Sequence, residues 1–279
     1  MSGARATTQS PVLSRGELRS GCSRCVCIAY ILRQSRTPRS IDLIERPPNP
    51  RARHWRRWCM RFAHLPLVGR FAAACAGWLL PPYAGRIFLA GLTARGYVAP
   101  SARLAHPGLT FGRNCFIGDG VLIYHDARGG AVVFGDQVQL GQDSIIQTGD
   151  GGSVSIGSRT SIQPRLQISA YRSPVVIGAR CEIAPNCAFY PYNHGMAPGQ
   201  PIQGQPTWTR GGIVVEDDAW LGYGVIVLDG VRIGAGAVIG AGSVVTSNIP
   251  PDAIAQGVPA RVVGSRQDLA AKRDRSTTA

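Results

Sequence analysis

His194 is the residue of this sequence best suited to chemistry. It lies in the segment YPYNHG at residues 190–195, inside the longest interruption of an otherwise regular hydrophobic pattern. Long loops on a rigid scaffold are where binding and catalytic residues concentrate. Because an imidazole titrates near pH ~6.5, it can accept a proton and return it at neutral pH. We predict that His194 is a general base; the alternative is a loop histidine that only hydrogen-bonds to the backbone.

The other histidines compete with His194 or lie apart from it. His125, at the end of a predicted coil, is the strongest competitor for the role of base, whereas His54 and His64 precede the repeated part of the chain. His106, His125 and His194 do not have the short spacing of metal ligands. We therefore predict that the protein binds no metal.

The elements that position these residues follow from a six-residue period. Hydrophobic residues recur in six triplets: 111, 117, 123; 134, 140, 146; 156, 162, 168; 177, 183, 189; 215, 221, 227; and 233, 239, 245. A period of six matches neither a helix nor an ordinary strand, so it predicts short strands that turn regularly around a solenoid of six coils. Successive triplets are 6 to 11 residues apart, except for 26 residues between Phe189 and Val215. One long loop therefore protrudes.

The sequence predicts four regions, of which the coils are one. Residues 1–53 are rich in Arg, Ser and Pro without periodicity, which is typical of disorder. Residues 54–104 predict short amphipathic helices, which either cap the first coil or lie on a membrane surface. Their most apolar run, 71–80, is too short to span a bilayer. Residues 105–264 form the all-β solenoid, and 265–279 form a tail with a short helix.

The positive charge is confined to the N-terminal part. Of the net charge of +14, residues 1–100 carry +13, from sixteen Arg and three acidic residues, which leaves the repeat nearly neutral. A basic segment can meet nucleic acid, an acidic partner or an anionic membrane. No aromatic and basic groove motif is present, so we predict no nucleic-acid partner and keep peripheral membrane contact as the alternative.

The cysteines predict a reducing compartment. Eight are scattered along a chain without a recognisable signal peptide, which predicts a cytoplasmic protein, at the inner face of the membrane if the basic segment binds there. Cys22, Cys25 and Cys27 form a CxxCxC cluster without a fourth ligand nearby, so we interpret the cluster as incidental.

Several motifs, taken together, resemble one family. The His-Gly loop, DDAWLG at 217–222, IGAGSVVT at 239–246 and GVPAR at 257–261 resemble the hexapeptide-repeat O-acetyltransferases. Over residues 105–264 the chain is similar to galactoside and maltose O-acetyltransferases and to the sugar O-acetyltransferases of polysaccharide biosynthesis. The resemblance implies a left-handed parallel β-helix, an exception to the usual right-handed crossover. It also implies a homotrimer with acetyl-CoA between adjacent prisms.

The resemblance also implies the site residues. A backbone N–H of Gly222 or Tyr223 would stabilise the oxyanion, and Arg261 suits the CoA phosphates. The residues implied to line the cofactor are Trp220, Tyr223, Ala241, Thr246, Ser247 and Arg261.

The acceptor side departs from the family. Arg165 follows Gln163 and Pro164 where galactoside acetyltransferases carry a sugar-contacting Asn. It either binds an acidic sugar or is a solvated charge, and Tyr192 and Asn193 beside the base are further candidates for acceptor contacts.

These observations predict an acetyl-CoA-dependent transferase that acetylates a sugar hydroxyl in surface or exopolysaccharide biosynthesis. A neutral hydroxyl is a poor nucleophile, so direct transfer needs a base such as His194. The alternatives are an acetyltransferase for serine or an antibiotic, and a non-catalytic β-helix scaffold with a basic docking segment.

Overall fold

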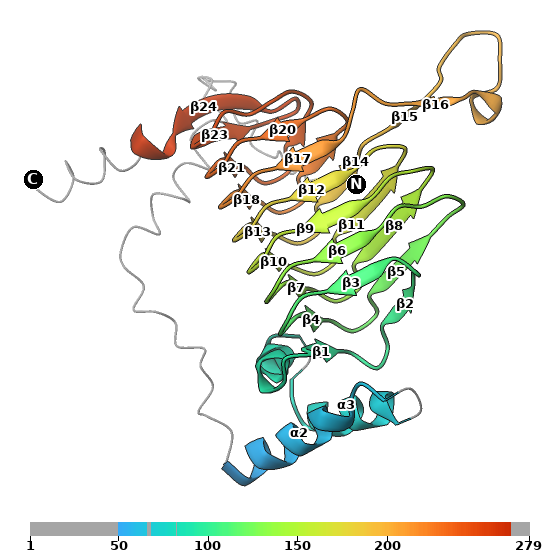
Figure 1. The fold of residues 1–279 in the computed structure, drawn as a ribbon. Helices are drawn as coiled ribbons and strands as arrows, with labels where there is room; N and C mark the ends of the chain where they lie inside the picture. The colour runs from blue at the N-terminus through green and yellow to red at the C-terminus, as the bar shows by residue number, and fades with distance from the viewer. Residues whose placement is uncertain (1–49, 66–67, 82, 269–279) are drawn as a thin grey trace, which may run out of the picture. The chain divides into compact units, whose positions relative to one another are not determined.

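The structure, a computed structural model, describes residues 50–65, 68–81 and 83–268. Parallel strands wind into a solenoid whose three sides are sheets (Figure 1). The predicted all-β solenoid is thereby confirmed. Residues 1–49, including Cys22, Cys25 and Cys27, and the tail beyond residue 268 lie outside the described residues, as does most of the predicted C-terminal helix, of which residues 266–268 are helical.

The first side is a nine-stranded sheet, parallel except for its last pair. Its strands are β1 (Tyr97–Val98), β4 (Phe116–Ile117), β7 (Gln139–Leu140), β10 (Ser161–Ile162), β13 (Glu182–Ile183), β18 (Trp220–Leu221), β21 (Val238–Ile239), β23 (Ala253–Gln256) and β24 (Arg261–Ser265). The second side is a seven-stranded sheet of β2 (Arg103–Ala105), β5 (Leu122–His125), β8 (Ile145–Gly149), β11 (Gln167–Tyr171), β14 (Ala188–Tyr190), β19 (Ile226–Leu228) and β22 (Val244–Val245). The third is a six-stranded sheet of β3 (Leu109–Phe111), β6 (Val132–Phe134), β9 (Val154–Ile156), β12 (Val175–Ile177), β17 (Ile213–Val215) and β20 (Arg232–Ile233).

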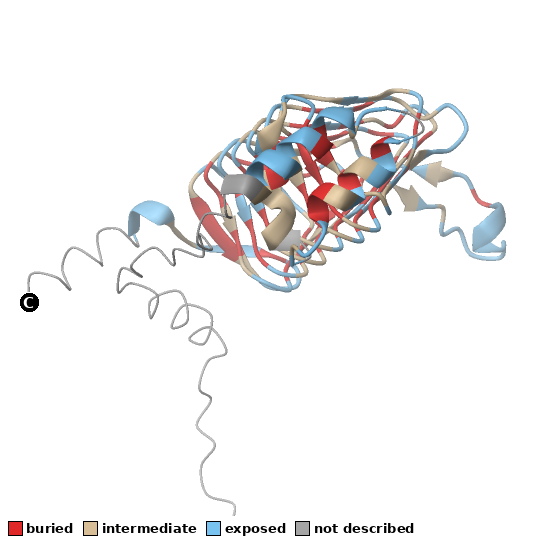
Figure 2. Cartoon of the chain, turned by 90° about the horizontal axis from the view of Figure 1, so that it is seen from below, coloured by how far each residue is buried: buried red, intermediate tan, exposed pale blue. Residues whose placement is uncertain are grey.

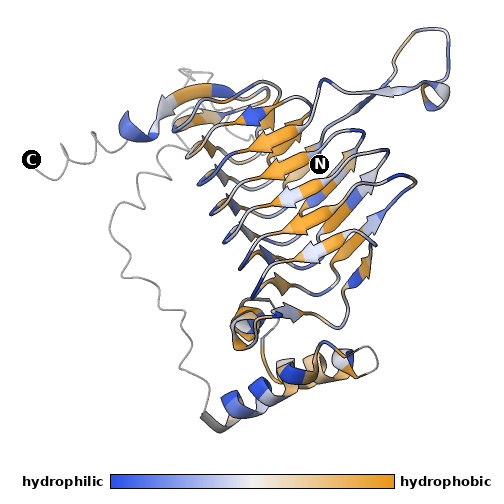
Figure 3. Ribbon diagram, viewed as in Figure 1, coloured by the Kyte–Doolittle hydropathy of each residue, from blue (hydrophilic) through white to orange (hydrophobic). Residues whose placement is uncertain are grey.

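The strand register follows the six-residue period. Within the seven-stranded sheet, for example, Ile146 pairs with Ile123 on one side and with Ile168 on the other. All the predicted triplet positions are buried except Phe111, which is half-buried near the N-terminal end. Buried and hydrophobic positions accordingly recur along the strands of the solenoid (Figures 2 and 3). Six coils match the predicted triplets.

One further turn precedes the predicted ones. β1 and β2 pair with β4 and β5, so the solenoid has about seven turns and begins before residue 105. Val98 and Leu104 hold the six-residue spacing in this turn. Leu92 holds the same spacing six residues before Val98, but it belongs to a helix rather than to a strand.

Two of the prism's corners matter for function. The first corner lies between the nine- and seven-stranded sheets. The turns at this corner stack in a column, and a backbone N–H of each turn donates to a carbonyl oxygen of the turn before it. Asn186 N donates to Pro164 O at 3.1 Å, Gly224 N to Pro185 O at 2.9 Å, and Gly242 N to Tyr223 O at 2.7 Å. The second corner lies at the opposite edge of the seven-stranded sheet, where the chain passes into the six-stranded sheet. Residues in one column therefore lie side by side although about twenty positions separate them.

Three helices cover the N-terminal end of the solenoid: α2 (Pro50–Phe62), α3 (Gly69–Gly77) and the 3₁₀ helix η1 (Tyr83–Leu92). A separate apolar cluster joins Met60 of α2, Ala76 of α3 and Leu89 of η1 to Tyr97 and Phe116 in the first turns. Burial of this cluster fixes the helices to the coil end. None of the described helices is long and apolar enough to cross a bilayer.

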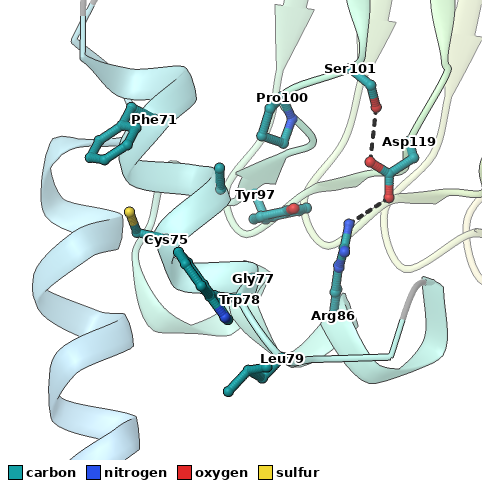
Figure 4. Close-up of a pocket in the computed structure, with 11 residues that line it drawn as sticks. Phe71, Cys75, Gly77, Trp78, Leu79, Arg86, Tyr97, Pro100, Ser101 and Asp119 are labelled. Atoms are coloured by element: carbon teal, nitrogen blue, oxygen red, sulfur yellow. Dashed lines mark hydrogen bonds and ion pairs between the residues drawn. The ribbon is translucent and has the colours of Figure 1, made fainter.

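A pocket between α3 and the first turns shows how the helical layer is attached (Figure 4). Arg86 of η1 donates to Asp119 at 2.7 Å, and Ser101 Oγ donates to the other carboxylate oxygen of Asp119 at 2.8 Å. Phe71 and Trp78 of the helical layer form its apolar side. The Asp119 carboxylate thus links the helices to two turns of the solenoid.

The cysteines of the described ranges, Cys59, Cys75, Cys115, Cys181 and Cys187, are all free. Burial raises the pKa of the Cys187 thiol to about 11. A thiol that stays protonated at neutral pH is a poor nucleophile, so Cys187 serves packing.

Candidate active site

The long loop emerges from the second corner between β14 and β17, as the sequence predicts (Figure 1). Its stem is an antiparallel pair of β15 (Asn193–His194) and β16 (Thr207–Trp208), and η2 (Ile202–Gly204) lies near its tip. His194 therefore sits on the paired stem of the loop, where the backbone on both sides is fixed.

Contacts inside the loop hold the His-Gly pair. Trp208 Nε1 donates to the carbonyl oxygen of His194 at 3.2 Å, and Gly195 N donates to Pro206 O at 3.0 Å. A Cβ atom at position 195 would lie only 2.8 Å from the Cβ of Gln205, so a glycine is needed for this close approach. Gln205 is buried, and its amide bonds both the N–H and the carbonyl oxygen of Ala197.

An ion pair anchors the end of the loop to the next coil. The Asp229 carboxylate, at the second corner, is 2% exposed and lies 3.1 Å from the guanidinium of Arg210. It also accepts a hydrogen bond from Arg210 N at 2.7 Å. Burial by itself would raise the pKa of Asp229, but hydrogen bonds from Arg210 and Asn193 and the charge of Arg210 lower it below the ordinary value. Since Asn193 precedes His194, this carboxylate bonds both arms of the loop.

We predict that Asp229→Asn lowers the turnover rate about tenfold or more while the solenoid stays folded. The neutral amide cannot pair with Arg210, so the loop loses its anchor and His194 its fixed position. Steady-state rates measure the effect, and Asp252→Asn, which removes a half-exposed carboxylate 3.7 Å from Arg266, is the control. Equal rates in the two variants would contradict the anchoring role.

The same pair predicts a pH dependence. A carboxyl whose folded pKa is lowered adds stability above its unfolded pKa of about 3.9, and the stability is lost as the pH falls through the lower folded value. The difference in melting temperature between wild type and Asp229→Asn should be constant from about pH 5 to 8 and shrink below about pH 4.

Aromatic side chains gather beside His194 on the seven-stranded sheet. The ring of Tyr192 is 6.0 Å from that of His194 and 5.4 Å from that of Tyr171. Tyr124 and Tyr190 are half-buried; burial is the main cause that raises the pKa of each, and the nearby Tyr192 adds to the rise. We call Tyr124, Tyr171, Tyr190 and Tyr192 the tyrosine patch. It holds four of the eight tyrosines of the chain.

Polar groups complete the patch. Gln147, paired with Tyr124 in the next strand, donates to the Asp126 carboxylate at 2.5 Å and accepts from Ser169 Oγ at 3.3 Å. The surface next to His194 therefore combines aromatic faces with hydroxyl, amide and carboxylate groups.

His106 and His125 lie together, although the sequence suggested that they were apart. Their rings are 5.5 Å from each other because β2 and β5 are neighbours. His106 Nδ1 accepts from Gly108 N at 3.1 Å, so its Nε2–H donates to Thr148 Oγ1 at 2.9 Å. Burial, and then His125, lower the pKa of His106. His106 is a neutral structural residue, and His125 is exposed.

The oxyanion candidates lie at the first corner. Gly222 and Ala241 are neighbours there, since a Cβ atom on Gly222 would lie 2.7 Å from Ala241 N. Gly222 N already donates to Ile239 O at 2.8 Å, whereas Tyr223 N has no backbone partner among the described residues. This geometry favours Tyr223 over Gly222 as the donor.

The other cofactor candidates are spread over three places. Trp220 is 46% exposed on the nine-stranded sheet, beside a hollow that Arg266 also lines. Arg261 is exposed on β24, and Thr246 and Ser247 follow β22 toward the second corner.

Arg165 belongs to the first corner, where its Nε donates to Asn186 Oδ1 at 2.8 Å. It does not lie with Tyr192 and Asn193, which are at the second corner. Within one coil, Tyr223 and Asp229 lie in the turns at the two ends of β19, at opposite corners of the prism. A single chain therefore does not bring His194 to Tyr223 and Ala241, whereas Thr246 and Ser247 lie toward the corner of His194.

Sequence reasoning missed Arg210 and Asp229. The available signal was weak: Asp229-Gly230 ends the first strand of the seven-stranded sheet after the loop, and Arg210 immediately precedes the glycine pair that closes the loop. Within residues 50–65, 68–81 and 83–268, no cluster of three or more His, Cys, Asp or Glu side chains could hold a metal ion.

Comparison with known proteins adds three relatives. The family model "Bacterial transferase hexapeptide (six repeats)" matches residues 212–247. Galactoside O-acetyltransferase of Lactococcus lactis is 39% identical over 88 residues, which are 32% of this chain and 42% of that protein. A Schizosaccharomyces pombe protein named as an acetyltransferase is 36% identical over 110 residues, 39% of this chain and 42% of its own length. A Mycobacterium tuberculosis protein, also named as an acetyltransferase, is 29% identical over 214 residues, 76% of this chain and 69% of its own length. The chain thus spans less than half the length of the first two relatives.

Proposed function

The chain carries the hexapeptide repeat of bacterial transferases and is similar to galactoside O-acetyltransferases, and on this basis we propose that it transfers an acetyl group from acetyl-CoA to a sugar hydroxyl. The observation that carries the proposal is the position of His194 on a braced loop stem, next to a patch of tyrosines and polar groups. A base beside a surface of that composition suits a hydroxylated substrate.

The chemistry assigns one role to each group. His194 accepts the proton of the acceptor hydroxyl while the hydroxyl oxygen forms a bond to the carbonyl carbon of the thioester. The N–H of Tyr223 donates to the oxyanion of the tetrahedral intermediate. The carbon–sulfur bond then breaks, and the imidazolium returns its proton to the CoA thiolate. No acetyl-enzyme is formed.

The site is completed by a second copy of the chain. His194 and Tyr223 lie at opposite edges of the seven-stranded sheet. In a homotrimer, the loop of one protomer would face the first corner of its neighbour, where the partner's Tyr223 and Ala241 would meet the cofactor, with the partner's Trp220 and Arg261 on the adjoining nine-stranded sheet. Arg165 also lies at that corner, which makes it a candidate contact for an acceptor held between the two copies.

The tyrosine patch supports a glycan as the acceptor. Tyrosine rings offer flat apolar faces with a polar end, and a few polar groups among them fix the orientation of a ligand. The patch extends from His194 over the coils of Tyr171 and Tyr124, so it fits several linked sugar residues better than one. A surface polysaccharide or its precursor is the substrate class that we propose, at the cytoplasmic face of the membrane.

Calorimetric titration of acetyl-CoA tests the donor, and release of free CoA thiol tests the acceptor. We expect micromolar binding at about one site per chain, and faster thiol release with an oligosaccharide than with the monosaccharide or with serine. Failure to bind acetyl-CoA would contradict the proposed acetyltransferase activity and favour a non-catalytic scaffold. Binding with turnover on serine alone would contradict the glycan acceptor.

A further inference from the structure

Helix α2 carries a stripe of exposed aromatic residues. Trp55, Trp58 and Phe62 are spaced three and four residues apart, so they share one side of the helix. Their exposed fractions are 53%, 54% and 38%. The Trp55 and Trp58 rings are stacked with centroids 5.5 Å apart, and Trp58 meets Phe62 edge-on at 5.0 Å. Three adjoining aromatic side chains are thus left in water, which is costly unless something covers them.

A second stripe, of arginines, runs beside the aromatic one. Arg53, Arg57 and Arg61 are spaced four residues apart and are all exposed. Together with His54 and Trp58 they line two adjoining hollows between α2 and the end of η1. We call the two stripes the Arg–Trp surface.

The opposite side of α2 is occupied by the protein. Cys59 and Met60 are 2% and 3% exposed and pack in the apolar cluster with α3 and η1. The guanidinium of Arg56 lies over the ring of Phe88 at 5.9 Å from its centroid. The contacts of α2 with the rest of the protein therefore hold the Arg–Trp surface outward.

Charge indicates what covers this surface. No acidic residue occurs between Glu45 and Asp119 in the sequence. The first 49 residues carry eight Arg and three acidic residues, so they would repel the surface, as would the same surface of a second copy. A partner with anionic groups above an apolar layer would bind the arginines through its charge and the aromatic residues through its apolar layer.

We infer that the Arg–Trp surface docks onto an anionic lipid bilayer with α2 lying along the interface. Arginines attract the phosphate groups of the leaflet, while tryptophan and phenylalanine insert at the level of the headgroups. With 13 residues, α2 can lie on the bilayer but cannot cross it. The inference stands on its own residues and is independent of the proposed acetyl transfer.

Co-sedimentation of the full chain with lipid vesicles tests the inference. We expect binding to vesicles that contain phosphatidylglycerol, little binding to pure phosphatidylcholine, and weakening by salt. Replacement of Arg53, Arg57 and Arg61 by Glu should lower the partition coefficient at least about tenfold, because each basic residue near an anionic surface adds to the attraction. Trp55→Ala with Trp58→Ala should lower it as well.

The matched control replaces Arg103, Arg113 and Arg159 by Glu, which changes the net charge equally at exposed positions on the solenoid. If this control loses as much binding as the α2 variant, net charge alone drives association and the inference is wrong. Equal binding to both lipids, or binding to single-stranded nucleic acid without binding to vesicles, would also overturn it. Circular dichroism and CoA titration of each variant show that fold and donor site are intact, so failure here is distinct from failure of the transferase proposal.

Discussion

His194→Ala should lower the catalytic rate by about 10² to 10⁴ while acetyl-CoA still binds. Without the imidazole, the acceptor hydroxyl must lose its proton to water as the new bond forms. The loop itself should persist, because its stem is held by backbone pairing of β15 with β16 and by Arg210 and Asp229 rather than by the imidazole ring. Steady-state rates with a saturating acceptor, together with calorimetric CoA titration, separate loss of chemistry from loss of binding.

His125→Ala is the control for that experiment. His125 is also exposed and lies beyond the tyrosine patch on the same sheet, with its Nδ1 donating to the carbonyl oxygen of Asp126 at 3.1 Å. We expect its removal to leave the rate within a factor of about three. A rate that falls for His125→Ala and not for His194→Ala would exchange the two roles.

Ile146→Ala should be the more damaging of two substitutions at adjacent positions of β8. Ile146 is fully buried between Ile123 and Ile168 of the neighbouring coils, whereas Ile145 on the outer face is 37% exposed. Truncation of a buried isoleucine leaves a cavity in a rigid column and costs about 2–5 kcal/mol. Ile145→Ala should cost about 1 kcal/mol or less, because its side chain is already partly in water.

Urea unfolding curves at one protein concentration measure the two free energies of unfolding. The comparison controls for strand propensity, since both positions carry isoleucine in the same strand. Equal losses of unfolding free energy in the two variants would mean that Ile146 is packed no better than Ile145. That result would contradict the assignment of inward-facing positions from the six-residue period.

The sequence predicted the coils well because every coil needs hydrophobic side chains at the same inward-facing positions. Ile123, Ile146 and Ile168 must face inward at equivalent positions, so the pattern is written again in every turn. Val98 and Leu104 of the first turn were missed, because a terminal coil is covered by helices rather than by another coil and does not need a full triplet.

The site was less predictable because it depends on neighbours that the period does not specify. The loop and His194 stood out as an interruption, but the pairing of Arg210 with Asp229 joins a loop end to the next coil. The spacing of His106 and His125 does not predict that they meet, although a shift of one coil places residues about nineteen positions apart side by side. The separation of His194 from Tyr223 follows from the two corners, which a linear motif does not encode.

The tyrosine patch lies on successive coils of the solenoid, so its length can change only by whole coils. Each coil contacts only its neighbours, so inserting or deleting one coil between His125 and the loop would lengthen or shorten the aromatic track by about 4.8 Å without changing the geometry at His194. If the acceptor is a glycan, as we propose, its preferred chain length would change with the duplication of a single turn, and the reacting groups would be left untouched.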